Sequence, residues 1–249
     1  MKSTIQYFLQ RMLGMTAYLK IFSWYKIKTL KNDKGENDFF FFLNLIPANS
    51  DVLDIGANIG IMAYYLSKKA AQNKVIAFEP MPQNLQTLHW VKSKFNLKNL
   101  TILNLALGNQ NGEIEMVLPV VDKVKKQGLS HVLTDEIKEF NEGETFKAKM
   151  CKLDDIQELV KLNIKAIKID VENFEYQVFR GAESILKQHK PIIYCELWDN
   201  KNRYDCFDYL TSLGYKIMVK QDNDIVEFDA KNHTTQNFFF VHYSANFVA

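Results

Sequence analysis

A short glycine-containing segment and a later acid have the spacing of a cofactor site. Residues 54–60 are Asp-Ile-Gly-Ala-Asn-Ile-Gly and follow an apolar segment. Gly56 lets the backbone turn tightly and approach a ligand, and Gly60 permits close packing of a following helix, while Asn58 tolerates a positive φ. Glu79 comes 25 residues after Asp54, at the end of the next apolar segment, where its carboxylate can accept hydrogen bonds from two ribose hydroxyls. The pattern indicates a nucleoside-containing cofactor.

The identity of the cofactor depends on the middle of this turn. A dinucleotide site needs G-x-G-x-x-G so that a pyrophosphate can approach the backbone, whereas this chain has Asn58 between its glycines. Asp54 disfavours a phosphate and suits a cation with an amino group and a sulfonium. S-adenosylmethionine has both. One alternative is a nicotinamide-dependent oxidoreductase. The alternative without a function is an ordinary tight turn with a solvated Glu79.

A third group of charges interrupts an expected central strand, residues 166–171. Strand alternation places Lys168, Asp170 and Glu172 on one face and apolar residues on the other. Charges in a central strand are costly unless they are paired or open on a ligand cleft. Either Lys168 and Asp170 form a structural pair while Glu172 caps the next helix, or Asp170 and Glu172 lie at the mouth of the cleft.

Transfer of a group from a bound cofactor would need an aligned acceptor and a base for the acceptor's proton. Glu172, Asp170 and Glu175 are the candidate catalytic bases, and His131 is an alternative. Asp170 and Glu196 could instead serve as oxygen ligands for magnesium that aligns the acceptor, so a divalent metal is an alternative that we do not predict.

Alternating strands and helices would position these residues. We expect an α/β fold with a doubly wound, mostly parallel seven-stranded sheet whose last strand is antiparallel. The expected strands are residues 52–55, 75–78, 100–105, 166–171, 191–197, 215–219 and 237–242. The expected helices are residues 59–71, 82–95, 176–188 and 204–213, with a short buried helix over residues 39–46 that Pro47 ends. Residues 112–150 alternate without long helices, and we expect them to form an inserted hairpin or flap on the substrate side of the domain.

The N-terminal segment differs in charge from the rest. The 249 residues have a net charge of +2, but residues 1–32 hold six basic residues and no acid, which leaves 25 basic against 29 acidic residues elsewhere. We therefore expect a basic amphipathic helical extension, residues 1–35, before a domain of residues 36–249. Residues 1–32 would pack on the domain or on a second copy, or make peripheral contact with a membrane.

Composition narrows the class of protein further. The small net charge gives no argument for nucleic acid. Three cysteines without metal-ligand spacing favour a reducing compartment, and we expect a cytoplasmic protein because no signal peptide or membrane span is apparent.

Five sequence segments together resemble the FkbM family of S-adenosylmethionine-dependent methyltransferases. The segments are VLDIGANIG (52–60), FEP (78–80), LALG (105–108), IKIDVENFEYQVFRGA (167–182) and PIIYCE (191–196). The resemblance implies a Rossmann-like class I methyltransferase that methylates a hydroxyl of a sugar, glycan or secondary metabolite and releases S-adenosylhomocysteine. Where the family usually has glycine after its D-x-E motif, this chain has Asn173, which can adopt the same left-handed turn.

The resemblance also implies cofactor contacts. The methionine end would lie at Asp54, Gly56, Ala57, Asn58 and Gly60, with Asp170 nearby. The ribose would lie at Glu79 and Pro80, and the adenine along residues 104–107, which include Asn104, Ala106 and Leu107. A non-catalytic cofactor-binding scaffold remains the second alternative. The acceptor, the oligomeric state and the role of the extension are not specified by any motif.

Overall fold

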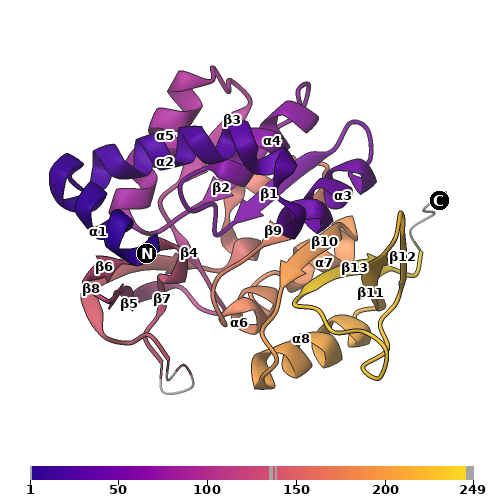
Figure 1. Ribbon diagram of the computed structural model, residues 1–249. Helices are drawn as coiled ribbons and strands as arrows, with labels where there is room; N and C mark the ends of the chain where they lie inside the picture. Colours follow the sequence, from indigo (N-terminus) through magenta and orange to yellow (C-terminus); the bar gives the residue numbers. More distant parts are fainter. Residues whose placement is uncertain (1, 135–136, 138, 245–249) are drawn as a thin grey trace.

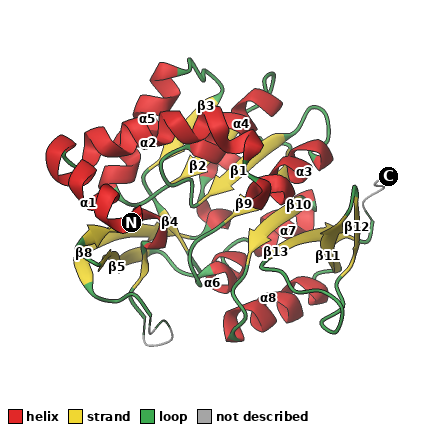
Figure 2. Ribbon diagram, in the orientation of Figure 1, coloured by secondary structure: helices red, strands yellow, loops and turns green. Residues whose placement is uncertain are grey.

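The computed structural model of the chain describes residues 2–134, 137 and 139–244, and the side chains from residue 5 onward. The helices are α1 Lys2–Leu13, α2 Met15–Thr29, α3 Asn37–Leu45, α4 Ile61–Lys69, α5 Pro82–Lys94, α6 Glu175–Arg180, α7 Glu183–His189 and α8 Lys201–Ser212. The strands are β1 Asp51–Ile55, β2 Val75–Phe78, β3 Leu100–Leu103, β4 Ala106–Leu107, β5 Gly112–Val121, β6 Val124–Lys125, β7 His131–Val132, β8 Gly143–Cys151, β9 Ile164–Ile169, β10 Ile192–Glu196, β11 Tyr215–Gln221, β12 Asp224–Glu227 and β13 Asn237–His242. Figure 2 shows their distribution along the fold.

The main sheet has the order β12-β11-β13-β10-β9-β1-β2-β3. The strands β3, β2, β1, β9 and β10 are parallel neighbours, and β13 runs antiparallel to both β10 and β11. This confirms the expected mostly parallel α/β sheet with an antiparallel last strand. The sheet has one strand more than the seven expected, because β12 pairs antiparallel with β11 at the edge. β12 is short and half exposed, so it lacks the apolar run that would have indicated a strand.

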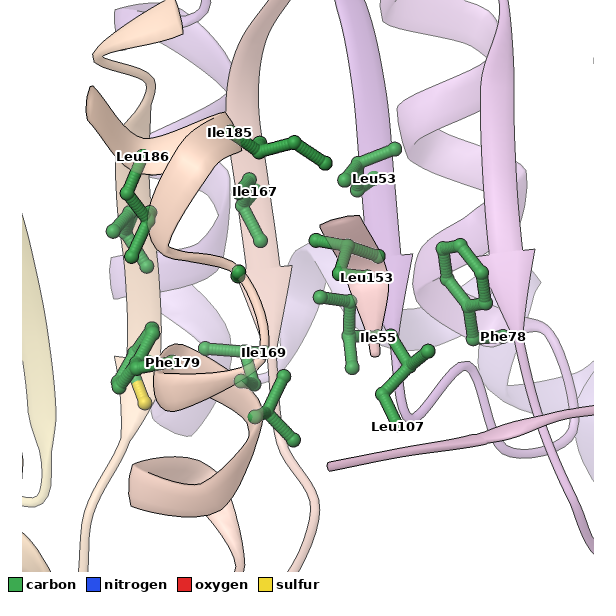
Figure 3. Packing of buried hydrophobic residues seen from close by; sticks show 14 of the residues in the cluster. Leu53, Ile55, Phe78, Leu107, Leu153, Ile167, Ile169, Phe179, Ile185 and Leu186 are labelled. Carbon is green, nitrogen blue, oxygen red and sulfur yellow. The ribbon is translucent and has the colours of Figure 1, made fainter. Parts of the chain in front are cut away.

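Helices cover the two faces of this sheet (Figure 1). On one face α3 and α4 pack against a cluster that includes Val52, Ala166 and Tyr194. On the other, α6 and α7 pack against Ile167, Ile169 and their neighbours, which Figure 3 shows from close by. Both faces of the parallel strands are buried, so the carboxyl edge of the sheet is left as the place for a ligand.

The insertion forms a small second sheet. Its order is β4-β8-β5-β6, with β7 also paired to β5, and β5 and β8 form a long antiparallel pair as expected for an inserted hairpin. Both ends of the insertion meet, because β4 pairs parallel with the end of β8 and the Gly108 amide donates to the Cys151 carbonyl at 3.2 Å. Residues 135, 136 and 138 of the insertion lie outside the described residues.

One expected helix is divided in two. Residues 176–188 were expected to form one helix, but α6 ends at Arg180 and α7 begins at Glu183. At the break, a Cβ on Gly181 would lie 1.9 Å from the Gly108 carbonyl oxygen. The glycine thus allows the chain to approach the base of the insertion, a tertiary contact that the helical pattern does not contain.

The N-terminal segment is helical, as expected. Gly14, with φ 73°, separates α1 from α2, and α2 lies along α5 (Figure 1). Tyr18 and Leu19 of α2 pack with Ile59 beside the glycine turn. Within the described ranges, none of the helices has the length and apolar character needed to cross a membrane. The division at residue 35 stays a prediction, as does the extent of the second unit, whose residues 245–249 are outside the described part.

Candidate active site

The glycine turn after β1 is fixed by close backbone contacts. Gly56 has φ 75°, and a Cβ there would lie 1.8 Å from the Asp170 carbonyl oxygen at the end of β9. Gly60 has φ 83°, and its Cβ would lie 2.6 Å from Leu88 of α5. Asn58 adopts the expected positive φ, 50°. Glycine is therefore required at position 56 by the close approach of the β9 backbone and at position 60 by the positive φ, and the turn brings the ends of β1 and β9 together.

Glu79 holds this turn from the neighbouring strand. Its Oε2 accepts a hydrogen bond from the Asn58 amide at 2.7 Å, and its Oε1 accepts from the Met81 amide at 2.9 Å and from Asn84 at 3.2 Å. Burial raises the pKa of Glu79 to about 7, against the lowering effect of these donors. The carboxylate expected to bind a ribose thus also positions the turn, with acceptor capacity remaining on Oε2.

A buried lysine joins the turn to the acids around it. Lys168 lies opposite Asp54 in the register of β9 and β1, and its Nζ donates to the Gly56 carbonyl at 2.9 Å. The same Nζ is 3.5 Å from Asp170 Oδ2 and 3.7 Å from Asp54 Oδ1. Burial opposes the charge of Lys168, but Asp170 and Asp54 raise its pKa overall. The expected Lys168–Asp170 pair is therefore present within a larger network.

Asp54 is fully buried in this network. Neither carboxylate oxygen has a hydrogen-bond partner among the described residues, and burial raises the pKa of the group. Its nearest opposite charge is Lys168. Asp54 is thus placed beneath the turn, next to the ligand edge of the sheet, rather than in the wall of a cavity.

A cavity opens between the turn and the insertion. Seven of the eleven residues expected to bind cofactor line it: Gly56, Asn58, Glu79, Pro80, Ala106, Leu107 and Asp170. Four do not: Asp54, Ala57, Gly60 and Asn104. Gly60 and Ala57 shape the turn behind the cavity, and Asn104 is exposed to solvent. The structure thus gathers residues from the ends of β1, β2 and β9 and from the segment after β3.

Other lining residues were not anticipated from the sequence. The insertion contributes Met116, Gln127, Gly128, Ser130 and Val132. The 3-10 helix Gln127–Leu129 folds over the cavity, and the Ser130 hydroxyl is fixed by the Val117 carbonyl at 2.9 Å. No spacing in the sequence indicates this fold-back, because it depends on pairing between β5 and β7.

A second cavity lies on the other side of Asp170. Carboxylates, amides and a phenol dominate its wall, which comprises Gly35, Glu36, Met62, Lys168, Ile169, Asp170, Tyr194, Glu196, Gln236 and Asn237. Burial and Asp170 raise the pKa of Glu196 to about 7, and burial and Asp33 raise the pKa of Glu36. Asp170 belongs to the walls of both cavities.

Glu172 lies differently from the expected strand pattern. β9 ends at Ile169, and Glu172 and Asn173 have φ values of 54° and 71°, so the alternation that grouped Glu172 with Lys168 stops before it. The left-handed turn expected at Asn173 is confirmed. Glu172 lines the first cavity and not the second. Burial raises its pKa to about 9, with further contributions from Asp170 and Glu196.

The other two candidate bases line neither cavity. Glu175 is buried, and its carboxylate accepts from the Val171 amide at 3.1 Å and from Asn202 at 2.6 Å. It thereby stabilises the turn that precedes α6. His131 is also buried, with Nδ1 2.8 Å from the Leu129 carbonyl and Nε2 2.9 Å from Asn141 Oδ1. These contacts hold the Glu175 and His131 side chains within the protein structure, away from both cavities.

In the part of the chain that the structure describes, no three His, Cys, Asp or Glu side chains are arranged to hold a metal ion. Asp170 and Glu196, the alternative magnesium ligands, do line one cavity together. Lys168 lies within that same wall, where its ammonium group competes for the Asp170 carboxylate.

Several known proteins are similar to this chain in sequence or in fold. A protein called Methyltransferase 1 from Beauveria bassiana is 24% identical over 193 residues, covering 70% of this chain and 76% of that protein. The AMB antimetabolite synthetase AmbE of Pseudomonas aeruginosa is 23% identical over 213 residues, and the matched part is 10% of its length. The crystal structure of methyltransferase FkbM from Methylobacillus flagellatus KT superimposes with a TM-score of 0.53 at 18% identity, covering 79% of this chain and 44% of that one.

A family model also matches most of the chain. A family model described as Methyltransferase FkbM domain matches residues 54–217, which run from the acid before the glycine turn to the strand β11. This range includes the turn, Glu79, the insertion and the acids at the ends of β9 and β10. The chain therefore belongs to the FkbM methyltransferase domain family, as its five sequence segments indicated.

Proposed function

We propose that this methyltransferase transfers a methyl group from S-adenosylmethionine to a hydroxyl oxygen of a sugar, glycan or other hydroxyl-rich metabolite. The observation that carries the proposal is the position of Asp170, which is part of the wall of the cavity beside the glycine turn on one side and of a polar cavity on the other. A donor and an acceptor bound in the two cavities would meet at this residue.

The first cavity suits a cationic nucleoside. Its described wall contains three acids, Glu79, Asp170 and Glu172, and no lysine or arginine. A sulfonium and an ammonium group would be attracted there, whereas a pyrophosphate would be repelled. This argues against the nicotinamide alternative. Glu79 would accept from the ribose through Oε2, and Leu105, Ala106 and Leu107 offer apolar surface for the adenine.

The second cavity suits an acceptor with several hydroxyl groups. Glu36, Glu196 and Asn237 come from three separate segments and present hydrogen-bonding groups to one space. Tyr194 lines the same space. Hydroxyl groups can donate to the carboxylates and accept from the amide and the phenol, so a sugar ring satisfies this wall better than an apolar metabolite does.

The bound cofactor supplies a methyl group that is already activated by its sulfonium. The protein then has to align the acceptor oxygen and receive its proton. Glu196 is the base that we propose, because a carboxyl with a pKa of about 7 is partly ionised at neutral pH and still basic enough to accept a proton. Glu172 and Asp170, the bases expected from sequence, would face the cation, which would lower the pKa of Glu172.

Transfer of labelled methyl groups tests this proposal. The purified protein is incubated with S-adenosylmethionine labelled in its methyl group and with acceptors of three classes: glycosides, phenols and amines. We expect incorporation into glycosides, in a product that mild base leaves intact because an ether forms. Label released by base as methanol would indicate a methyl ester, and labelling of amines alone would contradict the proposed class. Glu227→Gln, which changes an exposed acid in β12, is the matched control for a Glu196→Gln protein in the same assay.

The proposal includes a cytoplasmic location. Its support is that Cys151, Cys195 and Cys206 are all free thiols, two of them buried, as in proteins of reducing compartments. Treatment of intact cells with a membrane-impermeant protease should therefore leave the protein uncut, and cleavage under these conditions would contradict this location.

A further inference from the structure

Helix α1 exposes an apolar stripe. Its large apolar side chains recur three and four residues apart, so that they share one face of the helix, and their exposed fractions are between 40% and 78%. They are Ile5, Phe8, Leu9, Met12 and Leu13. Eight of the thirteen large apolar side chains that are exposed on the described surface lie in residues 5–25. Exposed apolar residues are common singly, whereas their concentration on one short helix indicates an interaction surface.

The polar side of α1 faces the protein. Gln6 donates to the Tyr18 hydroxyl at 2.9 Å and accepts from Lys126 Nζ at 3.0 Å. One turn later, Gln10 donates to the Lys125 carbonyl at 3.1 Å and accepts from the Lys125 amide at 3.2 Å. A helix that served only to cover the domain would turn its apolar side inward. Here paired hydrogen bonds hold the apolar stripe away from the domain.

Helix α2 also exposes large apolar side chains. Ile21, Trp24 and Tyr25 of α2 are 55%, 45% and 56% exposed. Tryptophan and tyrosine have an apolar ring with a polar group, which suits the boundary between lipid headgroups and acyl chains. Both helices lie along one side of the molecule, with α1 beside β6 of the insertion (Figure 1).

Charge distinguishes a lipid surface from a protein partner. Residues 1–32 hold six basic residues and no acid, although the remainder of the chain has more acids than bases. Arg11 and Lys28 are among the exposed members of this group. A second copy of the chain would bring the same positive charges against each other, whereas an anionic membrane neutralises them and takes up the apolar stripe.

We propose that α1, supported by the exposed residues of α2, docks on the surface of an anionic membrane with its apolar stripe in the interface. The helix lies in the plane of the membrane and does not span it. Because α1 is hydrogen-bonded to Lys125 and Lys126, docking places the insertion, and with it the wall of the first cavity, next to the lipid surface.

Flotation with vesicles tests the proposal on the full chain. The vesicles contain phosphatidylcholine with about 30% phosphatidylglycerol, or phosphatidylcholine alone as the neutral comparison. We expect the protein to float with the anionic vesicles at low salt, and its partition to fall about tenfold when the salt is raised to about 0.5 M. Arg11→Gln should lower the partition about fivefold.

Substitutions test whether the apolar stripe itself binds the vesicles or whether the protein adsorbs to them nonspecifically. Phe8→Glu combined with Met12→Glu should lower the partition at least about tenfold, and both sites are exposed enough that the thermal unfolding midpoint should not change. Val160→Glu is the matched control, because Val160 is 67% exposed on another part of the molecule and should not affect flotation.

Three results would overturn the proposal. One is the absence of flotation with anionic vesicles at low salt. Another is undiminished flotation of the folded Phe8→Glu, Met12→Glu protein. The third is a dimer, seen by analytical ultracentrifugation, that this double substitution dissociates while neither form binds vesicles, since that would identify a second copy as the partner of the stripe.

Discussion

The two cavities that meet at Asp170 are built in different ways. The first is bounded by a turn whose shape depends on backbone contacts between neighbouring strands, such as Gly56 against the Asp170 carbonyl. The second is bounded by side chains from segments far apart in the sequence, with Glu36 ahead of α3, Glu196 in β10 and Asn237 in β13. Substitutions on the two sides should therefore have different consequences. Changes to the turn should affect folding and cofactor binding, and changes to the polar wall should affect turnover.

The largest effect is expected at Gly56. Gly56→Ala adds a Cβ within 1.8 Å of the Asp170 carbonyl oxygen, at a φ that already disfavours alanine. We expect a loss of about 4 kcal/mol in the free energy of unfolding, measured by urea denaturation. Gly14→Ala is the matched control, because Gly14 has φ 73° but open space around its Cβ position, and it should lose only about 1 to 2 kcal/mol. Equal losses would mean that backbone strain alone, and not the close contact with β9, requires glycine at position 56.

The second-largest effect is expected from a substitution of Glu196 in the polar cavity. Glu196→Gln should lower kcat about 100-fold and leave the Kd of S-adenosylhomocysteine unchanged, because it removes the proposed base without touching the first cavity. Since the ionised carboxylate is the active form, kcat of the unchanged protein should rise with pH through about 7, the pKa of Glu196. The variant should lack this rise. A full rise in the variant would assign the titration to another group.

The smallest of the three effects should come from Glu79. In Glu79→Gln an amide nitrogen must face either the Asn58 or the Met81 backbone N–H, so the turn loosens on the cofactor side. We expect the Kd of S-adenosylhomocysteine to rise about tenfold by calorimetry. Glu36→Gln, on the other cavity, should leave this Kd unchanged and raise KM for the acceptor. A weaker cofactor affinity in Glu36→Gln would show that the cavities are not separable.

The same contrast explains which parts of the site could be predicted from the sequence. The turn, its positive φ values and Glu79 are encoded within short segments, since glycine spacing and strand ends are local properties. The polar wall depends on how α3 and β13 meet β10, which no local pattern specifies. Strand alternation was extended past the end of β9 to Glu172, which lies in a left-handed turn and still lines the first cavity together with Asp170.

The fold shows a comparable limit. Strands and helices with a strong apolar pattern, such as β2 and α5, were predicted with nearly their observed bounds. The break between α6 and α7 was missed, because it results from the contact between Gly181 and Gly108 and not from a local helix stop. The strand β12 was missed because its exposed edge position requires no apolar alternation.

The meeting of the two ends of the insertion affects how this enzyme can change over evolutionary time. The chain leaves the main sheet near Gly108 and returns at Cys151, where the two strands are hydrogen-bonded and Gly181 closes the junction. A loop with adjoining ends can be lengthened, shortened or exchanged at small entropic cost and without moving the sheet. Residues 112–150 can therefore vary in length and sequence while the glycine turn stays in place, and such changes would reshape the wall of the first cavity, to which the insertion contributes Met116, Gln127 and Val132.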